Sequence, residues 1–296
     1  MSRLRNAFYA QAVCDAVGAP FEFGDPQPSE VLKFAINGKL EITDDTQMAL
    51  FGQEAVNRCY RVTHAKPMAI HATLCDAVEK AYLRWYETQS ETREVKPGHF
   101  GLQAEPLMRH CRAPGNACMS SLRRLAKGKP SYDRQVAISN NHNGCGAVMR
   151  LLPFAGLMES TGDFKFAQSI ALKSAAITHG HPEVAIAVEL YMRAADEALR
   201  GDWSQRNDFV TTKSITNLGE GWTSLECVMM ALWAVANSKS FEELLVNSIC
   251  HPGDSDSVAA VAGSIWGLYG HEVPTHMLDR LVEKKVIDKV LADADR

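Results

Sequence analysis

Helical periodicity runs through nearly the whole chain and restricts its fold more than any other feature. From residue 6 to residue 17, apolar side chains recur every three or four positions, the spacing of an amphipathic helix. Strand patterns are confined to Val31–Ile36 and Val136–Ser139, and both are short. We therefore expect an irregularly packed all-α fold that forms a single domain over residues 1–296. The further ranges predicted to be helical are 69–86, 117–126, 147–158, 164–178, 182–200, 227–236, 244–249, 256–269 and 274–291.

Composition narrows the class of protein. Of 296 residues, 46% are hydrophobic, which is enough for a large core. The net charge of −4 and the lack of a basic block argue against direct nucleic-acid binding. No signal-peptide pattern or apolar run of about 18 residues occurs, so we expect a cytoplasmic protein without a membrane partner. Eight cysteines without a C-x-x-C motif predict free thiols rather than a zinc site.

Several predicted helices carry start signals. Thr223 with Glu226 and Ser240 with Glu243 have the spacing of a capping box. The helix predicted at 256–269 is rich in alanine, glycine and serine, which lets another backbone approach closely. Two polar stretches, 87–106 and 201–222, are predicted to be long loops, and loops of this length are often functional.

Two short acidic clusters stand where helices are expected to begin. The first is Thr43-Asp44-Asp45-Thr46 and the second is Asp254-Ser255-Asp256-Ser257. Either one alone is accounted for by helix capping, since Asp, Ser and Thr suit a helix N-terminus. A cap needs only one side chain, however, and each cluster offers two carboxylates beside hydroxyl groups. The turn formed by His251-Pro252-Gly253 also holds the second cluster tightly.

If the two clusters meet in space, their charges must be neutralised. Carboxylates about 5 Å apart repel by ~3 kcal/mol per pair at an effective dielectric constant near 20. Six such pairs cost on the order of 20 kcal/mol, more than the stability of a whole domain. Two divalent cations balance four carboxylates, and an all-oxygen ligand set favours Mg²⁺, Mn²⁺ or Ca²⁺ over zinc.

Glycine and histidine residues make further candidates for a binding site. Asn143-Gly144-Cys145-Gly146 precedes an apolar run, and glycines there can present backbone N–H groups to phosphate oxygens. The same segment can equally be an ordinary turn before a helix, since it lacks the lysine of a P-loop. Gly115 lies in a second such turn. His179 and His181 can bind metal, or they can cap a helix and line a pocket.

These segments together resemble the ADP-ribosylglycohydrolase family. The resemblance extends from about residue 5 to Gly270. The family includes the dinitrogenase reductase-activating glycohydrolases and the ADP-ribosyl-acceptor hydrolases. It implies a compact, orthogonal multi-helix domain that removes ADP-ribose from an ADP-ribosylated protein or other acceptor. The matching segments, in order, are residues 15–23 (Asp-Ala-Val-Gly-Ala-Pro-Phe-Glu-Phe), 43–46, 143–150, Thr178-His179, Gly221-Trp222 and 253–257.

The resemblance also implies roles for individual residues. A pair of Mg²⁺ or Mn²⁺ ions is expected, and Glu22 matches a glutamate that gates the metal site or assists catalysis in relatives. Asp45 and Asp256 are the other expected catalytic residues. ADP-ribose is expected to be bound by Gly115, Asn143, Gly144, Cys145, Gly146 and His179, and the metal ions by Thr43, Asp44, Asp45, Asp254, Asp256 and Ser257.

The chain departs from some relatives at two places. Ala113-Pro114-Gly115 replaces an Asp-Ile-Gly triplet whose aspartate is associated with ADP-ribosyl-arginine, so the linkage that is cut stays open. His251-Pro252-Gly253 replaces a common Gly-Gly pair.

Three other functions are possible at this point. The chain could bind ADP-ribose without cutting it, or act as an immunity protein against an ADP-ribosylating toxin. It could be a phosphatase with an Asp-x-Asp motif, although that motif usually follows a strand of an α/β sheet. It could also be a helical protein with capped helices and no active site, but six motifs in register argue against this.

Overall fold

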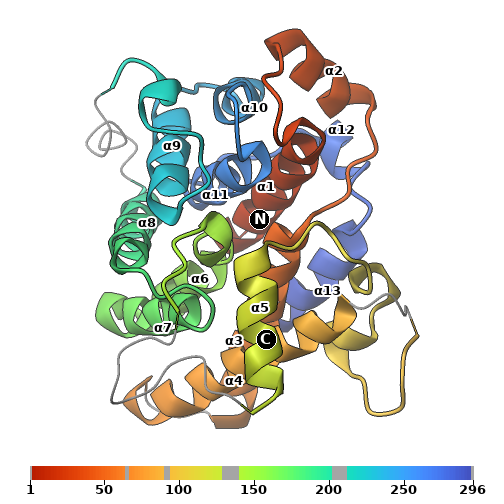
Figure 1. Cartoon of the computed structure of the whole chain (residues 1–296), viewed down its shortest axis with the longest axis vertical. Helices are drawn as coiled ribbons and strands as arrows, with labels where there is room; N and C mark the ends of the chain where they lie inside the picture. The colour runs from red at the N-terminus through yellow and green to blue at the C-terminus, as the bar shows by residue number, and fades with distance from the viewer. Residues whose placement is uncertain (1, 64–66, 90–93, 129–139, 202–211, 295–296) are drawn as a thin grey trace.

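The computed structural model describes residues 2–63, 67–89, 94–128, 140–201 and 212–294. Within these ranges the chain forms thirteen α-helices and no β-strand, as predicted (Figure 1). No helix in the described ranges is long and apolar enough to span a membrane. The helices are α1 (Arg3–Gly18), α2 (Pro28–Asn37), α3 (Asp44–Thr63), α4 (Pro67–Thr88), α5 (Asn116–Ala126), α6 (Leu152–Thr161), α7 (Phe164–Ala176), α8 (Pro182–Arg200), α9 (Ser224–Ala236), α10 (Phe241–Ile249), α11 (Ser255–Leu268), α12 (Thr275–Leu278) and α13 (Lys284–Ala294).

Short 3₁₀ helices link several of these elements. They are η1 (Ala19–Phe21), η2 (Gly101–Ala104), η3 (Pro106–Met108), η4 (Cys145–Ala147) and η6 (Ile215–Asn217).

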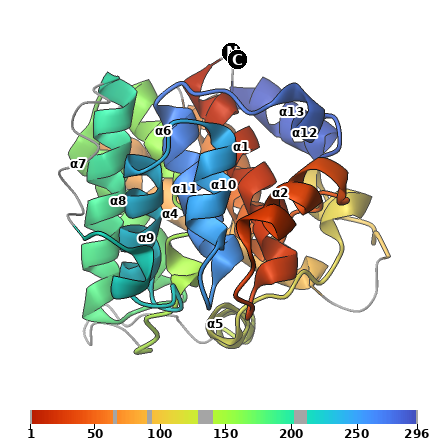
Figure 2. The ribbon, with the colours of Figure 1, turned by 90° about the horizontal axis from the view of Figure 1, so that it is seen from above.

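The paired helices α1 and α11 form the centre of the molecule. All residues of α11 are buried, and the two helices lie side by side with the other helices around them (Figure 2). Glycines allow this close approach: a Cβ atom on Gly263 would lie 2.5 Å from the carbonyl oxygen of Ala10, and one on Gly267 would overlap Ala7. The prediction that small residues in 256–269 admit another backbone is confirmed.

The pair brings the ends of two distant segments together. A Cβ atom on Gly18, the last residue of α1, would lie 2.7 Å from Cα of Asp256 in the first turn of α11. The hydroxyl of Ser255 donates to the carbonyl oxygen of Gly18 at 3.3 Å. The turn that follows α1 is thus held against the start of α11.

Three sequence expectations for local structure need correction: the possible strand at 31–36 and the helices predicted at 147–158 and 274–291. The possible strand at Val31–Ile36 is part of α2, because Val31 and Ala35 are spaced four apart and both face the core. The helix predicted at 147–158 begins only at Leu152, since Pro153 fits a helix only in its first turn. The other possible strand, Val136–Ser139, lies outside the described residues.

The helix predicted at 274–291 is interrupted. The chain leaves α12 and forms a bridge between Leu281 and Leu40, and the N–H of Val282 donates to the carbonyl oxygen of Leu40 at 3.0 Å. The buried carboxylate of Glu283 then accepts the N–H of Ile42 at 3.3 Å before α13 begins. These long-range bonds outweigh the local helical periodicity. The capping box of Thr223 and Glu226 is confirmed.

Candidate active site

The two acidic clusters meet in one cavity, although they lie about 210 residues apart in sequence. Asp44 and Asp45 stand in the first turn of α3, Asp254 caps α11, and Asp256 stands in its first turn. The cavity has a volume of about 410 Å³, and all four aspartates line it together with Glu22. Helix capping accounts for the position of one of these carboxylates, because the Asp254 side chain accepts the N–H of Ser257 at 3.2 Å.

Most of the predicted site residues line this cavity. They are Glu22, Asp44, Asp45, Gly115, Gly144, Cys145, Gly146, His179, Asp254, Asp256 and Ser257. Thr43 and Asn143 do not line it. The hydroxyl of Thr43 donates to Asp15 at 2.7 Å, and the carbonyl oxygen of Asn143 accepts the N–H of Ser224 at 2.7 Å.

Asp15 is a buried residue to which the sequence analysis assigned no role. Its carboxylate accepts the hydroxyl groups of Thr43 and Thr46 at 2.7 and 2.5 Å, as well as their backbone N–H groups. It therefore anchors the N-terminus of α3, where Asp44 and Asp45 lie. One sequence feature could have indicated this role: Asp15 is a charged residue that stands among the apolar Val13, Cys14 and Val17 of a predicted helix.

The cavity concentrates negative charge. No lysine or arginine is among the described residues that line it. Burial and the nearby Asp256 raise the pKa of Asp15 to about 7 and that of Glu22 to about 7. Burial and then repulsion from Asp256 also raise the pKa values of Asp44, Asp45 and Asp254 well above the ordinary value. Protons or cations must neutralise this group of carboxylates.

The arrangement of oxygen atoms fits divalent cations. One carboxylate oxygen each from Glu22, Asp254 and Asp256 lies within 4.8 Å of the other two. The Oδ2 atom of Asp45 is buried and has no hydrogen-bond partner among the described residues. Unpaired carboxylate oxygens in a buried cluster are the ligands that hard cations such as Mg²⁺ and Mn²⁺ prefer.

The glycine-rich loop forms one wall of the cavity. A Cβ atom on Gly146 would lie 2.9 Å from Sγ of Cys118 and 3.1 Å from the ring of His179, so only glycine fits there. The N–H of Cys145 already donates to the carbonyl oxygen of Trp222 at 3.0 Å. The expectation that this loop offers its N–H groups to phosphate therefore does not extend to Cys145. Its thiol instead donates to Asp254 at 2.6 Å.

His179 is held in a defined orientation at the cavity wall. Buried Arg150 donates to the Thr178 hydroxyl at 2.6 Å, and that hydroxyl lies 2.7 Å from Nδ1 of His179. Because arginine only donates, the Thr178 hydrogen is available to Nδ1, which leaves the hydrogen of a neutral ring on Nε2. Burial, Arg150 and His142 lower the pKa of His179 well below its ordinary value, so the ring stays neutral.

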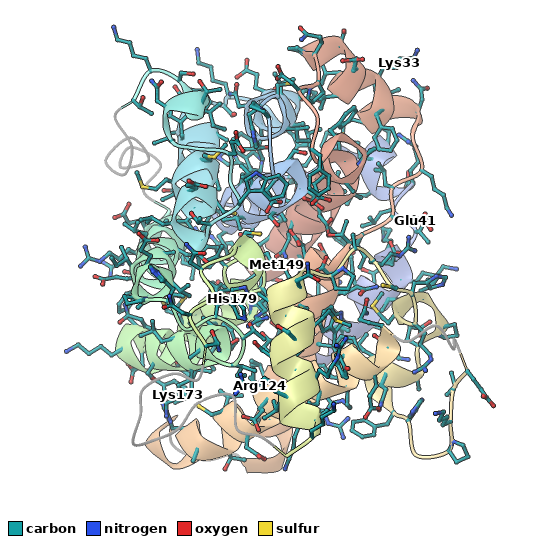
Figure 3. The ribbon with its side chains drawn as sticks, in the orientation of Figure 1. Lys33, Glu41, Arg124, Met149, Lys173 and His179 are labelled. Carbon is teal, nitrogen blue, oxygen red and sulfur yellow. The ribbon has the colours of Figure 1, made fainter. Side chains whose placement is uncertain are left out.

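The opposite wall comes from the segment before α5. Ala113 has a left-handed backbone with φ of 55° and lines the cavity with Pro114 and Gly115. The carbonyl oxygen of the preceding Arg112 accepts the N–H of Asp44 at 3.1 Å, so this wall is tied to the first acidic cluster. Met149 and His179, labelled in Figure 3, lie on the cavity wall near the start of α5.

Comparisons with known sequences identify the family of the chain. The sequence model of the ADP-ribosylglycohydrolase family matches residues 1–296. The ADP-ribosylarginine hydrolase Tri1 of Pseudomonas putida (strain GB-1) is 25% identical over 316 aligned positions, covering 98% of this chain and 77% of the relative. An uncharacterized protein of Archaeoglobus fulgidus is 28% identical over 173 residues, covering 49% of this chain and 56% of the archaeal protein.

A solved structure shares the fold. The ADP-ribosylglycohydrolase-related protein complex aligns with a TM-score of 0.63 at 24% identity, covering 98% of this chain and 96% of the other. The match of the family model over the full length shows that the chain belongs to the ADP-ribosylglycohydrolase family.

Proposed function

We propose that the protein is a hydrolase that releases ADP-ribose from an ADP-ribosylated protein by cutting the glycosidic bond at C1 of the distal ribose. The observation that carries this proposal is the meeting of Asp44, Asp45, Asp254 and Asp256 in one cavity beside Glu22. Family membership supports the reaction class. The name of the Pseudomonas relative, an ADP-ribosylarginine hydrolase, makes ADP-ribosyl-arginine the first substrate to test.

Two divalent cations, Mg²⁺ or Mn²⁺, fit the donor set of this cavity. The residues that would hold them are Asp44, Asp45, Asp254, Asp256 and Ser257, which line the cavity. Thr43, the sixth predicted ligand, lies beside them but donates its hydroxyl to Asp15, so it would reach a cation only with an oxygen lone pair. Bound there, the ions would supply positive charge that offsets the carboxylates and lowers the pKa of a nearby water molecule. The buried, unpaired Oδ2 atom of Asp45 supports a cation in this place.

Glu22 is the candidate for proton transfer. Its side chain is half-buried at the cavity, and one of its carboxylate oxygens lies within 4.8 Å of carboxylate oxygens of Asp254 and Asp256, which puts it beside the proposed cations and their water. In the metal-free chain, burial and Asp256 raise the pKa of Glu22 to about 7. In the ionised form the carboxylate accepts a proton from the attacking water. In the protonated form it gives a proton to the departing acceptor group. Cleavage at an anomeric carbon passes through an oxocarbenium-like state, which nearby carboxylates stabilise.

The remaining walls are suited to hold the ADP-ribose. We assign this role to Gly115, Gly144, Cys145, Gly146 and His179, all of which line the cavity. The Nε2–H group of His179 would donate to a phosphate or ribose oxygen. Asn143 lies behind this wall, and its carbonyl oxygen holds the start of α9 through Ser224.

Substitution of single aspartates tests the proposal. Asp45→Ala and Asp256→Ala should each abolish release of ADP-ribose from an ADP-ribosylated arginine peptide, and excess chelator should do the same to the wild-type chain. Substrates with other ADP-ribosyl linkages are assayed in parallel with the arginine peptide, because the group to which ADP-ribose is attached is not yet determined. Full activity in Asp256→Ala would refute the metal role. Tight ADP-ribose binding without turnover on any linkage would favour a binding or immunity protein.

A further inference from the structure

Glu22 lies in an unusual turn. The N–H of Gly24 donates to the carbonyl oxygen of Phe21 at 2.9 Å, Glu22 has φ of −51° and ψ of 135°, and Phe23 has φ of 66°. These values describe a type II β-turn with Glu22 and Phe23 as its central residues. The third position of such a turn normally takes glycine or asparagine, and a bulky side chain there is a rare exception.

The side chain of Phe23 is also exposed to solvent, so burial of its ring contributes little to stability. It is 76% accessible, the highest value among the large apolar side chains described as exposed. Its ring stacks on that of Trp222, with 5.0 Å between the centroids and 24° between the planes. Both residues line the rim of the cavity. The stack is thus the interaction that a glycine at position 23 would lack.

The backbones around both partners of the stack are bonded to other walls of the cavity. The N–H of Phe23 donates to the carbonyl oxygen of Gly253 at 3.1 Å. On the other side, the carbonyl oxygen of Glu220 accepts the N–H of Asp254 at 2.9 Å, and Trp222 accepts the N–H of Cys145. The stack therefore adds a side-chain link between the turn that carries Glu22 and the segment of Trp222, which bonds to Asp254 through Glu220.

We propose that Phe23 and Trp222 are positioning residues, whose stack holds the turn so that the Glu22 carboxylate faces Asp254 and Asp256. Glycine would adopt the same turn at lower conformational cost and would keep the backbone bond to Gly253, but without the stack the turn would hold the Glu22 side chain less firmly. Phenylalanine at this position costs backbone strain, and in return its stacked ring fixes the orientation of Glu22. Strained residues at active sites commonly serve such a purpose. This inference rests on the proposed function of Glu22.

A double-mutant cycle of Phe23→Gly and Glu22→Gln tests the inference. Phe23→Gly should lower kcat for ADP-ribose release by about tenfold, since misplacement of a reacting group is costly. In the Glu22→Gln background the same substitution should change kcat by less than about twofold if Phe23 acts through Glu22. The single variants Phe23→Tyr and Trp222→Phe each retain two stacked rings, so each should keep a kcat closer to that of the wild type than to that of Phe23→Gly.

Two controls separate positioning from other roles. The melting temperature of Phe23→Gly should stay within about 3 °C of the wild type, because glycine suits the turn. An unchanged kcat, or an equal fall of kcat in both backgrounds, would overturn the inference. A rise in KM at unchanged kcat would also overturn it, since it would mean that Phe23 contacts the substrate.

A readout without catalysis completes the test. The Glu22 carboxylate lies within 4.8 Å of carboxylate oxygens of Asp254 and Asp256, so its charge should contribute to cation binding. The Kd for Mn²⁺, measured by calorimetry, should therefore rise in Phe23→Gly and should not rise further when Phe23→Gly is added to Glu22→Gln. If the wild-type chain released ADP-ribose from no substrate, the proposed function would fail while this cycle would still decide the positioning role. A Kd that Phe23→Gly leaves unchanged, or raises equally in both backgrounds, would contradict it.

Discussion

The carboxylate of Asp15 accepts a 2.7 Å hydrogen bond from the hydroxyl of Thr43, which joins helix α1 to the segment that starts α3. It also accepts the hydroxyl of Thr46 at 2.5 Å. A fully buried carboxylate that makes no contact with solvent thus sets the position of Asp44 and Asp45.

Asp15→Ala should therefore destabilise the protein and impair the site. With Mg²⁺ present to offset the charge of the other carboxylates, we expect the free energy of unfolding to fall by about 2–3 kcal/mol, because buried donors lose their acceptor. Denaturant titration measures this. The matched control is Asp76→Ala, whose carboxylate is 57% exposed and pairs with Lys80, and which should cost about 0.5 kcal/mol or less. Equal effects of the two substitutions would contradict the anchoring role.

Thr178→Val should weaken substrate binding through His179. The hydroxyl links Arg150 to Nδ1 of His179, and without it the ring can change tautomer and turn away from the cavity. We expect KM for the ADP-ribosylated substrate to rise by about tenfold with a smaller change in kcat, the cost of about one hydrogen bond. Thr161→Val is the control, because it removes a hydroxyl that bonds to Leu157 and to the N–H of Asp163, neither of which lines the cavity. An unchanged KM in Thr178→Val would show that the link to His179 has no role.

Gly146→Ala should disturb the cavity wall. Its Cβ atom would come within 2.9 Å of Cys118 Sγ and 3.1 Å of the His179 ring. We expect a loss of about 1–3 kcal/mol in the free energy of unfolding, as for overpacking of a core. Gly115→Ala meets no atom within 4 Å and should stay within about 0.5 kcal/mol of the wild type. Thermal and denaturant unfolding would both register the difference, and equal stability of the two variants would be the contrary result.

The stability of the metal-free protein should decrease as pH rises. Asp15 and Glu22 have pKa values raised to about 7 by burial and by Asp256, against ordinary values of 3.8 and 4.5. Between about pH 4 and pH 7 these two carboxyl groups keep protons in the folded chain that the unfolded chain has released, so their contribution lowers the free energy of unfolding as pH rises. The lowered pKa values of His71, His179, His251 and His271 act in the opposite direction below about pH 6.5, but Asp44, Asp45 and Asp254, whose pKa values are raised well above the ordinary value, add to the fall. The melting temperature in chelator should drop by several degrees from pH 5 to pH 8.

Divalent cations should reverse this trend, because they replace the protons in the cavity. Added Mg²⁺ should stabilise the chain more at pH 8 than at pH 5. Asp256→Asn removes the charge that raises the other pKa values, and its stability should depend less on pH. A melting temperature that rises from pH 5 to pH 8 in chelator would contradict this account.

The sequence predicted most of the helices because their signals are local. Apolar spacing and a capping box defined α9, and Pro182 marked the start of α8. The helix that follows the glycine-rich loop was wrongly predicted to begin at residue 147. Pro153 is a local signal for the later start that the apolar spacing concealed, whereas the buried contacts of Arg150 depend on packing. Long-range bonds likewise divide the segment 274–291.

The site was only partly predictable. The acidic clusters were visible as pairs of carboxylates at helix starts, and charge balance indicated cations if they met. That they meet depends on the contact of Gly18 with the start of α11, which no local pattern encodes. The anchoring role of Asp15 and the stack of Phe23 on Trp222 arise from the same tertiary contacts.

The central claim is that carboxylates from α3 and α11 share a pair of hard cations. Anomalous diffraction from crystals grown with Mn²⁺ tests this most directly. We predict two peaks about 3.5–4 Å apart between Asp44–Asp45 and Asp254–Ser257. A cavity without an anomalous peak at saturating Mn²⁺ would contradict the account.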